Sequence, residues 1–437
     1  MSIWWKKTIG IFTLFLLFAI NANSQDSDAY TLHFDTQRDG ISVSSNGYDI
    51  SILYSIQQLS FRHITSDNGE YVKISVPNHI STTTPGEPEL PIYSSLIVIP
   101  DDGNYSINIS DIRYEEFLLD EYGITYPIYP SQEETTKSSI QSSENIYINK
   151  TSYLSDGFLE HDTVAIDIVG KVRGTTMATM TISPIFYNPK RNSLCVITNM
   201  DIEISFSGGA SQPSEISAIS DVLKRAAINY NANEVVPEYT ETPLRMVILT
   251  DTTLSEALRP FIQWKHQKGI ETILLFKGDV SVGTTDTEMR NALANLYNSN
   301  LKPDYLLIVG NTDIIPNYSA SSFITDLYYG EYDGGDDYIP DVLIGRIPAS
   351  NAKEVVDVTS KIIQYEKMEF PDNGTYLRDA LVFAGVDATY EDFMNGHINY
   401  AINNYLTNEN NINEHHSYVG ESQKDSILNI INNGVSF

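Results

Sequence analysis

The stretch Tyr305-Leu-Leu-Ile-Val309, which ends at Gly310, decides the fold class of the C-terminal half of the chain. Five consecutive apolar residues followed by a glycine are typical of a strand that is buried on both faces. Similar short runs occur on either side of it, at Met246–Leu249, Thr272–Phe276 and Leu381–Ala384. The segments between these runs have helical spacing. Strands that alternate with helices predict a parallel α/β sheet covered on both faces.

Helices are expected at Leu254–Lys268, Thr285–Asn298, Ala352–Glu366, Ile398–Leu406 and Ser426–Asn432. Gly269 follows the first of them, as a C-terminal capping glycine does. Another short strand is expected at Val342–Ile344, and Val435–Phe437 looks like the beginning of one more. Because ligands of such sheets bind outside the carboxyl ends of the strands, a functional site is expected in the loops Gly310–Asp341 and Gly385–Gly396.

The N-terminal half follows a different pattern. Short stretches such as Tyr105–Ile109, Val164–Ile168 and Asp201–Phe206 alternate apolar and polar residues. Alternation with period two predicts half-buried strands. We therefore expect an all-β sandwich or barrel over residues 25–206. A linker or activation segment follows over residues 207–242. It begins with the linker-like stretch Ser207–Ser217, and Ile219–Tyr230 could form a short helix within it.

Residues 1–24 have the pattern of a cleaved secretory signal. Lys6 and Lys7 precede the apolar run Ile9–Ile20, and small residues lead up to a cleavage position after Ser24. The run is shorter than the ~20 residues that span a bilayer, so stable membrane insertion is not expected. An uncleaved anchor is the alternative.

The chain has 57 acidic and 27 basic residues, which give a net charge of −30. Nucleic acid and anionic lipid are therefore not expected as partners, because both need basic patches. The single cysteine, Cys195, excludes an internal disulfide and a cysteine-rich zinc module. No histidine lies near it, so we interpret it as a packed strand residue. His415 and His416 would point to opposite faces of a strand, which argues against a shared metal ion.

Two groups of carboxylates are candidates for a site. Asp387, with Glu391 and Asp392 in the same loop, follows a predicted strand at the carboxyl edge of the sheet, where it could orient a histidine or receive a basic group. The second group is the acidic loop with Asp326, Glu331, Asp333, Asp336, Asp337 and Asp341. Glycines in this loop let the backbone wrap an ion, so a calcium site is one interpretation. A solvated polar loop is the alternative for both groups.

Several segments resemble the gingipain family, the secreted cysteine endopeptidases of Bacteroidota with a caspase-like fold. In the first half the matching segments are Gly86–Tyr93, Leu96–Pro100, Gly170–Arg173 and Ile182–Pro189. In the second half they are Phe261–Gly269, Tyr305–Gly310, Asp313–Pro316, Thr325–Gly330, Asp341–Ile347 and Tyr365-Glu366. The resemblance implies a propeptide-like β domain at 25–206, an activation segment at 207–242 and the N-terminal part of a caspase-like catalytic domain at 243–437.

The resemblance also implies residue roles. Asp387 falls where the family places the acid that orients the catalytic histidine. Asp392, with Asn395 as its competitor, lies near the aspartate that receives a basic P1 side chain. Calcium binding is implied at Asp326 and Asp336, with Asp337 beside them, and no other cofactor is required. The segment Asn433–Phe437 resembles the lead-in to the catalytic histidine, so we expect the sequence to stop before that histidine and the catalytic cysteine, and to be inactive by itself.

The function implied is a secreted or cell-surface endopeptidase precursor that acts on proteins and peptides. Its own propeptide and a type IX secretion machinery are the expected partners. Activation is expected by cleavage after Arg225, in the basic pair Lys224-Arg225. The alternatives are a non-catalytic surface or adhesion protein, and a peptidase that processes type IX secretion cargo.

Overall fold

The computed structural model describes residues 29–36, 38, 40–66, 69–100, 104–132, 146–207, 218–230, 243–319, 324–333, 337–384, 391–412, 414–419 and 424–435. The predicted signal, Asp336 and Asp387 lie outside these residues, as do the last two residues of the predicted strand Val435–Phe437. The chain divides into two compact units. The first combines Met1–Leu244, Leu293–Tyr305 and Thr325–Ile344, and the second combines Arg245–Ala292, Leu306–Ile324 and Gly345–Phe437.

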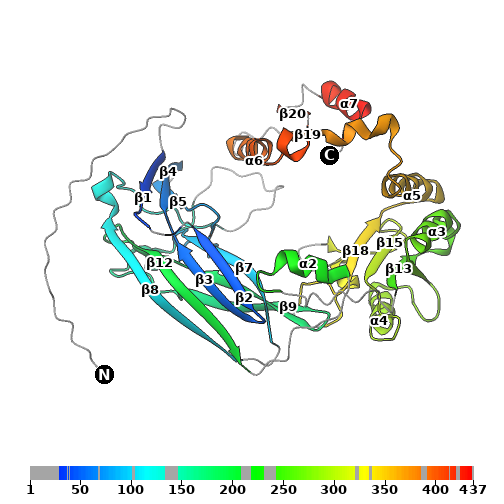
Figure 1. Cartoon of the computed structure of the whole chain (residues 1–437), viewed down its shortest axis with the longest axis horizontal. Coiled ribbons are helices and arrows are strands. Elements are labelled where there is room, and N and C mark those ends of the chain that lie inside the picture. The colour runs from blue at the N-terminus through cyan, green and yellow to red at the C-terminus, as the bar shows by residue number, and fades with distance from the viewer. Residues whose placement is uncertain are drawn as a thin grey trace. The chain divides into compact units, whose positions relative to one another are not determined.

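The first unit is built from antiparallel strands, as the alternating pattern predicts (Figure 1). They are β1 (Ala29–His33), β2 (Ile41–Asn46), β3 (Asp49–Ser55), β4 (Gln58–Ser66), β5 (Gly69–Ser75), β6 (Ile80–Ser81), β7 (Pro91–Ile99), β8 (Asn104–Leu118), β9 (Val164–Val172), β10 (Thr175–Ile182), β11 (Ile185–Asn188) and β12 (Ser193–Ser207). The sheets have the orders β1-β4-β5, β6-β7-β10-β9 and β11-β12-β3-β2, with β8 also paired to β12. The part of the unit before Leu244 also contains the short helices α1 (Lys150–Tyr153) and α2 (Ala218–Ala226) and the 3-10 turn η1 (Leu119–Tyr122).

The strand β12 organises the largest sheet. It pairs antiparallel with β11, β3 and β8, and β8 runs beside it over the whole of their length (Figure 1). Ile202 and Ile204 are buried whereas Glu203 between them is exposed. This alternation gives the sheet one apolar face, and each buried isoleucine contributes about 1.5–3 kcal/mol relative to exposure. The core of the unit includes Ile52, Tyr54, Leu59, Ile97, Met180 and Ile202.

A parallel α/β sheet dominates the second half of the chain, as the alternating apolar runs predict. Its strands are β13 (Leu244–Thr250), β14 (Ile270–Phe276), β15 (Tyr305–Val309) and β18 (Leu343–Ile347), in the order β14-β13-β15-β18. A separate parallel pair joins β19 (Asp379–Ala384) to β20 (Glu414–Val419). The helices are α3 (Arg259–Gln267), α4 (Asp286–Tyr297), α5 (Ala352–Glu366), α6 (Glu391–Asn404) and α7 (Lys424–Asn433). Smaller elements are η2 (Thr252–Leu254), η3 (Glu256–Leu258), β16 (Tyr318–Ser319), β17 (Ile324–Thr325), η4 (Leu327–Tyr329), η5 (Pro371–Arg378) and η6 (Asn408–Asn410).

Two helix starts differ from the prediction by more than two residues. The segment Leu254–Lys268 is not one helix, because the α-helix begins only at Arg259, after two 3-10 turns. Pro260 in its first turn fits that start, since proline lacks an N–H and the first turn needs none. The helix α6 begins at Glu391, seven residues before the expected Ile398. The sequence places Gly396 at the end of a loop, but a glycine inside a helix costs only about 1 kcal/mol, and the helix includes it.

Among the residues that the structure describes, no helix is both long and apolar enough to cross a membrane.

Candidate functional site: the acidic segment

The hairpin of β9 and β10 turns at Arg173-Gly174, between the paired residues Val172 and Thr175. The φ angles are +49° at Arg173 and +75° at Gly174. Positive φ at both central residues characterises the type I′ turn, which matches the twist of two adjacent strands. Glycine and asparagine adopt this backbone readily, whereas an arginine there is uncommon.

Arg173 makes contacts within the first unit, both to Leu293–Tyr305 and to the acidic segment, which we define as the described residues 325–333 and 337–344. Its guanidinium Nη1 donates to the carbonyl of Pro303 at 2.9 Å and lies 3.6 Å from Asp304 Oδ1. The exposed fractions of the Arg173 and Asp304 side chains are 8% and 9%. A buried carboxylate needs a cation or several donors, and Arg173 supplies the cation.

Among the described carboxylates of the acidic segment, Asp341 is the most deeply buried, with an exposed fraction of 0%. It accepts hydrogen bonds from the backbone N–H groups of Arg173 at 2.9 Å and Tyr332 at 2.8 Å, and from the hydroxyl of Tyr297 at 3.2 Å. Burial and the adjacent Asp341 carboxylate raise the pKa of Tyr297 far above its usual range. Tyr297 therefore stays a neutral hydrogen-bond donor at physiological pH.

Asp337 contacts the same hairpin through the backbone. Its carboxylate accepts from the N–H of Lys171 at 2.5 Å and from the N–H of Ile339 at 2.8 Å. Gly170 has φ +155°, and a Cβ atom at this position would overlap the Asp337 carboxylate. The close approach therefore requires a glycine.

Burial, followed by repulsion from Asp341, raises the pKa of the neighbouring Asp333 to about 6.

The calcium hypothesis named Asp326, Asp336 and Asp337. Asp326 precedes η4, and its side chain makes no capping hydrogen bond there. The carboxylate of Asp337 accepts hydrogen bonds from the N–H groups of Lys171 and Ile339. In the described parts of the chain, no group of three or more His, Cys, Asp or Glu residues is placed to hold a metal ion. Calcium binding at this segment stays a prediction.

The loop that follows β15 at the sheet edge is fixed by basic side chains. Arg346 Nη1 donates to the carbonyl groups of Gly310 at 2.8 Å and Ile315 at 2.9 Å. Lys277 Nζ donates to the carbonyl of Ile314 at 2.6 Å. The beginning of this loop is thus held by hydrogen bonds from two basic side chains.

The other expected site residues of the second unit lie on separate elements. Asp387 follows β19 in a stretch outside the described residues. Asp392 and Asn395 lie on α6, and not in a loop as expected. His415 and His416 are neighbours on β20, opposite Ala380 and Leu381 of β19.

Cys195 has the properties of a packed strand residue. It pairs with Phe186 of β11 and with Glu116 of β8. Burial and then the charge of Glu116 raise the pKa of its thiol. A nucleophilic thiol needs a lowered pKa, so the environment of Cys195 is the opposite of a catalytic one.

Arg225 is exposed in the last turn of α2, and the chain beyond it is held in place. The N–H of Ile228 donates to the carbonyl of Leu96 at 3.0 Å. Asn229, with an exposed fraction of 0%, accepts from the N–H of Val98 and donates to the carbonyl groups of Val98 and Tyr48. The predicted cleavage position therefore lies in the last turn of α2, directly before an anchored segment.

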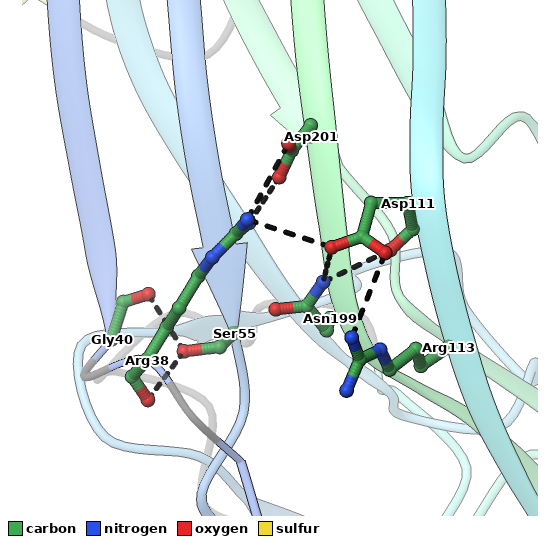
Figure 2. Close-up of polar contacts among 7 residues, drawn as sticks. All are labelled: Arg38, Gly40, Ser55, Asp111, Arg113, Asn199 and Asp201. Carbon is green, nitrogen blue, oxygen red and sulfur yellow. Dashed lines mark hydrogen bonds and ion pairs between the residues drawn. The ribbon is translucent and has the colours of Figure 1, made fainter.

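A second polar cluster closes the loop before β2 onto the sheet (Figure 2). Arg38 forms an ion pair with Asp201 and lies 3.5 Å from Asp111. Asn199 donates to the carbonyl of Asp111 at 2.9 Å and to its carboxylate at 3.1 Å, at an irregularity in the pairing of β8 with β12. Arg113 forms a further ion pair with Asp111, at 3.8 Å. Because its charges are paired with one another, we interpret this cluster as structural.

Arg173 and Asp304 were not identified from the sequence as site residues. The signal that could have found Arg173 is its position in Val172-Arg173-Gly174-Thr175, between two alternating stretches. A two-residue hairpin turn there favours Asn-Gly, and an arginine at the first position is a departure that needs a reason.

Two family models match consecutive parts of the chain. The model for propeptide C25 matches residues 31–235, and the model for peptidase family C25 matches residues 239–437. The chain belongs to the gingipain-like cysteine peptidase family. The β9–β10 hairpin lies in the propeptide match, and the acidic segment that it contacts lies in the peptidase match.

Curated proteins of Porphyromonas gingivalis are among the relatives that match the chain. The chain is 28% identical to Lys-gingipain over 88% of its own length and 23% of the relative, so it spans less than a quarter of that protein. It is 22% identical to gingipain R2 over 77% of its own length and 46% of the relative.

Solved structures of gingipains also match. One, described for the zymogenic latency of gingipain K, is 23% identical, has a TM-score of 0.39, and covers 41% of this chain and 100% of its own. The Arg-specific cysteine proteinase gingipain R is 21% identical with a TM-score of 0.40, and covers 45% of this chain and 47% of its own.

Proposed function

We propose that the chain contributes the propeptide and the N-terminal part of the peptidase domain of a secreted, gingipain-like cysteine endopeptidase. The observation that carries this proposal is the succession of the propeptide and peptidase matches in one chain. The contacts between the β9–β10 hairpin and the acidic segment support a propeptide that binds its own peptidase part. We also propose that residues 1–24 act as the secretory signal and that a type IX machinery exports the protein.

The reaction proposed is hydrolysis of a peptide bond through a thiol nucleophile. A histidine accepts the thiol proton, the thiolate attacks the substrate carbonyl, and backbone N–H groups stabilise the oxyanion that forms. In this scheme Asp387 orients the histidine. Cys195 takes no part, because its thiol is packed in β12 and its pKa is raised. The 437 residues by themselves are therefore expected to be inactive.

A basic P1 residue is the proposed specificity. The names of the relatives, Lys-gingipain and gingipain R, support a preference for lysine or arginine, and the longer match to Lys-gingipain favours lysine. Asp392, or Asn395 in its place, is proposed to lie at the P1 side chain. Calcium binding at Asp326, Asp336 and Asp337 is proposed as support for the fold of the acidic segment.

Peptide hydrolysis by the whole secreted protein tests the function. We expect fluorogenic peptides with P1 lysine or arginine to be cleaved, and a thiol-alkylating reagent to abolish cleavage. The variant Cys195→Ala should cleave at the wild-type rate and remain equally sensitive to alkylation. Cleavage that survives alkylation, or that disappears in Cys195→Ala, would contradict the assignment.

The P1 proposal has its own experiment. Removing the charge in Asp392→Asn should lower kcat/KM for basic peptides by at least about tenfold, because a desolvated charge pair contributes about 2–5 kcal/mol. Hydrolysis of a peptide with a neutral P1 residue is the matched control and should change little. An equal loss for both peptides would place Asp392 outside the P1 contact.

Activation is expected by cleavage of the bond between Arg225 and Ala226. Since Arg225 lies at the end of α2, the helix must open locally before a peptidase can bind it. N-terminal sequencing of the processed protein should give Ala226, and Arg225→Gln should slow processing. A processed form that begins before Ile219 would exclude this position.

A further inference from the structure

We propose that the hairpin tip, residues 170–174, is a recognition element that orders the acidic segment. The partner that it fits is the acidic segment together with Asp304, whose carbonyl accepts from the N–H of Leu343, since the buried carboxylates there need N–H donors and one cation. The inference rests on the proposed function only where it treats the hairpin tip as part of a propeptide. Its test measures the acidic segment itself, so it can fail while the peptidase assignment stands.

The conformation of the turn supports a role beyond the turn. Arg173 occupies the left-handed region at φ +49°, where a side chain with a Cβ atom is disfavoured. Asparagine or glycine would form the same turn at lower cost. The turn alone therefore does not account for an arginine, whereas its contacts outside the hairpin do.

The carboxylates of Asp304, Asp337 and Asp341 receive hydrogen bonds or an ion pair from the hairpin tip. The N–H groups of Lys171 and Arg173 donate to Asp337 and Asp341, and the Arg173 guanidinium lies beside Asp304. Asp304 and Asp341 are both buried. Without the hairpin tip these carboxylates would lose donors and a cation in a dry environment, and the segment would have to rearrange to hydrate them.

Apolar contacts also hold the acidic segment against the strands of the hairpin. Ile339 and Leu343 of the acidic segment pack against a cluster that includes Val98, Val172 and Met177. Gly170 lets the Asp337 carboxylate reach the backbone of β9. The hairpin tip thus presents a cation, two N–H donors and an apolar support at fixed positions.

The test is hydrogen–deuterium exchange of the full chain with Arg173→Asn. Asparagine suits the turn but lacks the guanidinium. The reporting amides are those of Tyr332 and Ile339, which donate to Asp341 and Asp337, and that of Leu343, which donates to the carbonyl of Asp304. We expect these amides to exchange at least about tenfold faster, since hydrogen bonds to charged groups are among the stronger ones. Exchange in β9 and β10 should not change.

Arg191→Ala is the matched control, because Arg191 is an exposed arginine of the first unit that pairs with Asp156 at 3.7 Å. It should leave the reporting amides unchanged. Gly170→Ala is the second variant and should accelerate exchange most at Ile339. Unchanged exchange in Arg173→Asn, or the same acceleration in Arg191→Ala, would overturn the proposal. Loss of protection in β9 and β10 would also overturn it, because Arg173 would then be a structural residue of the hairpin.

Discussion

Asp333 carries a carboxyl group that the folded protein protonates more readily than the unfolded chain does. Burial, followed by repulsion from Asp341, raises its pKa to about 6, whereas an unfolded aspartate has a pKa of about 3.9. Between these two pH values the folded state binds more protons than the unfolded state. The free energy of unfolding therefore falls as the pH rises from about 4 to about 6.

The variant Asp333→Asn tests this coupling. At pH 7 it should unfold at a temperature about 1–3 °C above wild type, because it removes a charge that its neighbours repel, although partial exposure screens the effect. At pH 4 the two proteins should unfold at the same temperature. The exposed Glu160→Gln is the control and should show no such pH dependence. A gain of equal size at both pH values would refute the interpretation.

The candidate site could be predicted from the sequence only in part. The density of acidic residues between Asp326 and Asp341 is a local property and was recognised. Arg173 lies 168 residues from Asp341, and no local pattern reveals that the two meet. From the sequence, calcium binding and a solvated loop are therefore the two interpretations of these carboxylates, and the pairing of Asp341 and Asp337 with N–H groups of the hairpin is visible only in the structure.

At the scale of elements, Glu366 ties α5 to α3. Its carboxylate accepts from Trp264 Nε1 at 2.8 Å, Lys265 Nζ at 2.6 Å and Lys268 Nζ at 2.9 Å. Burial raises the pKa of Glu366, but the hydrogen bonds from the two lysines and the tryptophan outweigh burial and lower it to about 2. The residues that resemble the gingipain family in both helices thus meet in one cluster.

Replacing Glu366 with glutamine should destabilise the protein by about 1.5–3 kcal/mol at pH 7, because hydrogen bonds between charged groups are lost. The wild-type advantage is present above the unfolded pKa, near 4.3, and disappears as the pH falls toward about 2. Urea unfolding at several pH values measures it. Glu369→Gln, at an exposed position nearby, should change little. A Glu366→Gln loss that is the same at pH 3 and pH 7 would contradict this role.

Elements defined by a local pattern were predicted well. The bounds of β15 and α5 agree with the prediction to the residue, because a continuous apolar run and a helical period are local signals. The strand β8 extends far beyond Tyr105–Ile109, through the mostly exposed stretch Ser110–Glu116. Its backbone pairing with β12 maintains the strand there, and side-chain patterns do not report backbone pairing.

At the scale of the whole molecule, the compact units do not follow the order of the sequence. The first unit contains segments from both sides of Arg225. Ala227–Tyr230 and the acidic segment follow the predicted cleavage position, yet both contact strands that precede it. The contacts that hold the first unit together therefore do not depend on the peptide bond after Arg225.

Cleavage after Arg225 should consequently leave the two fragments associated. On size-exclusion chromatography at pH 7 the cut protein should elute at the position of the intact chain, and the fragments should separate only in denaturant. Asn229→Ala should weaken the association of the cut protein about tenfold or more, because Val98 would be left with an unpaired buried N–H and carbonyl. The uncut Asn229→Ala chain controls for misfolding. Fragments that separate in native buffer would show that the contacts across the cut are too weak to act as a propeptide interface.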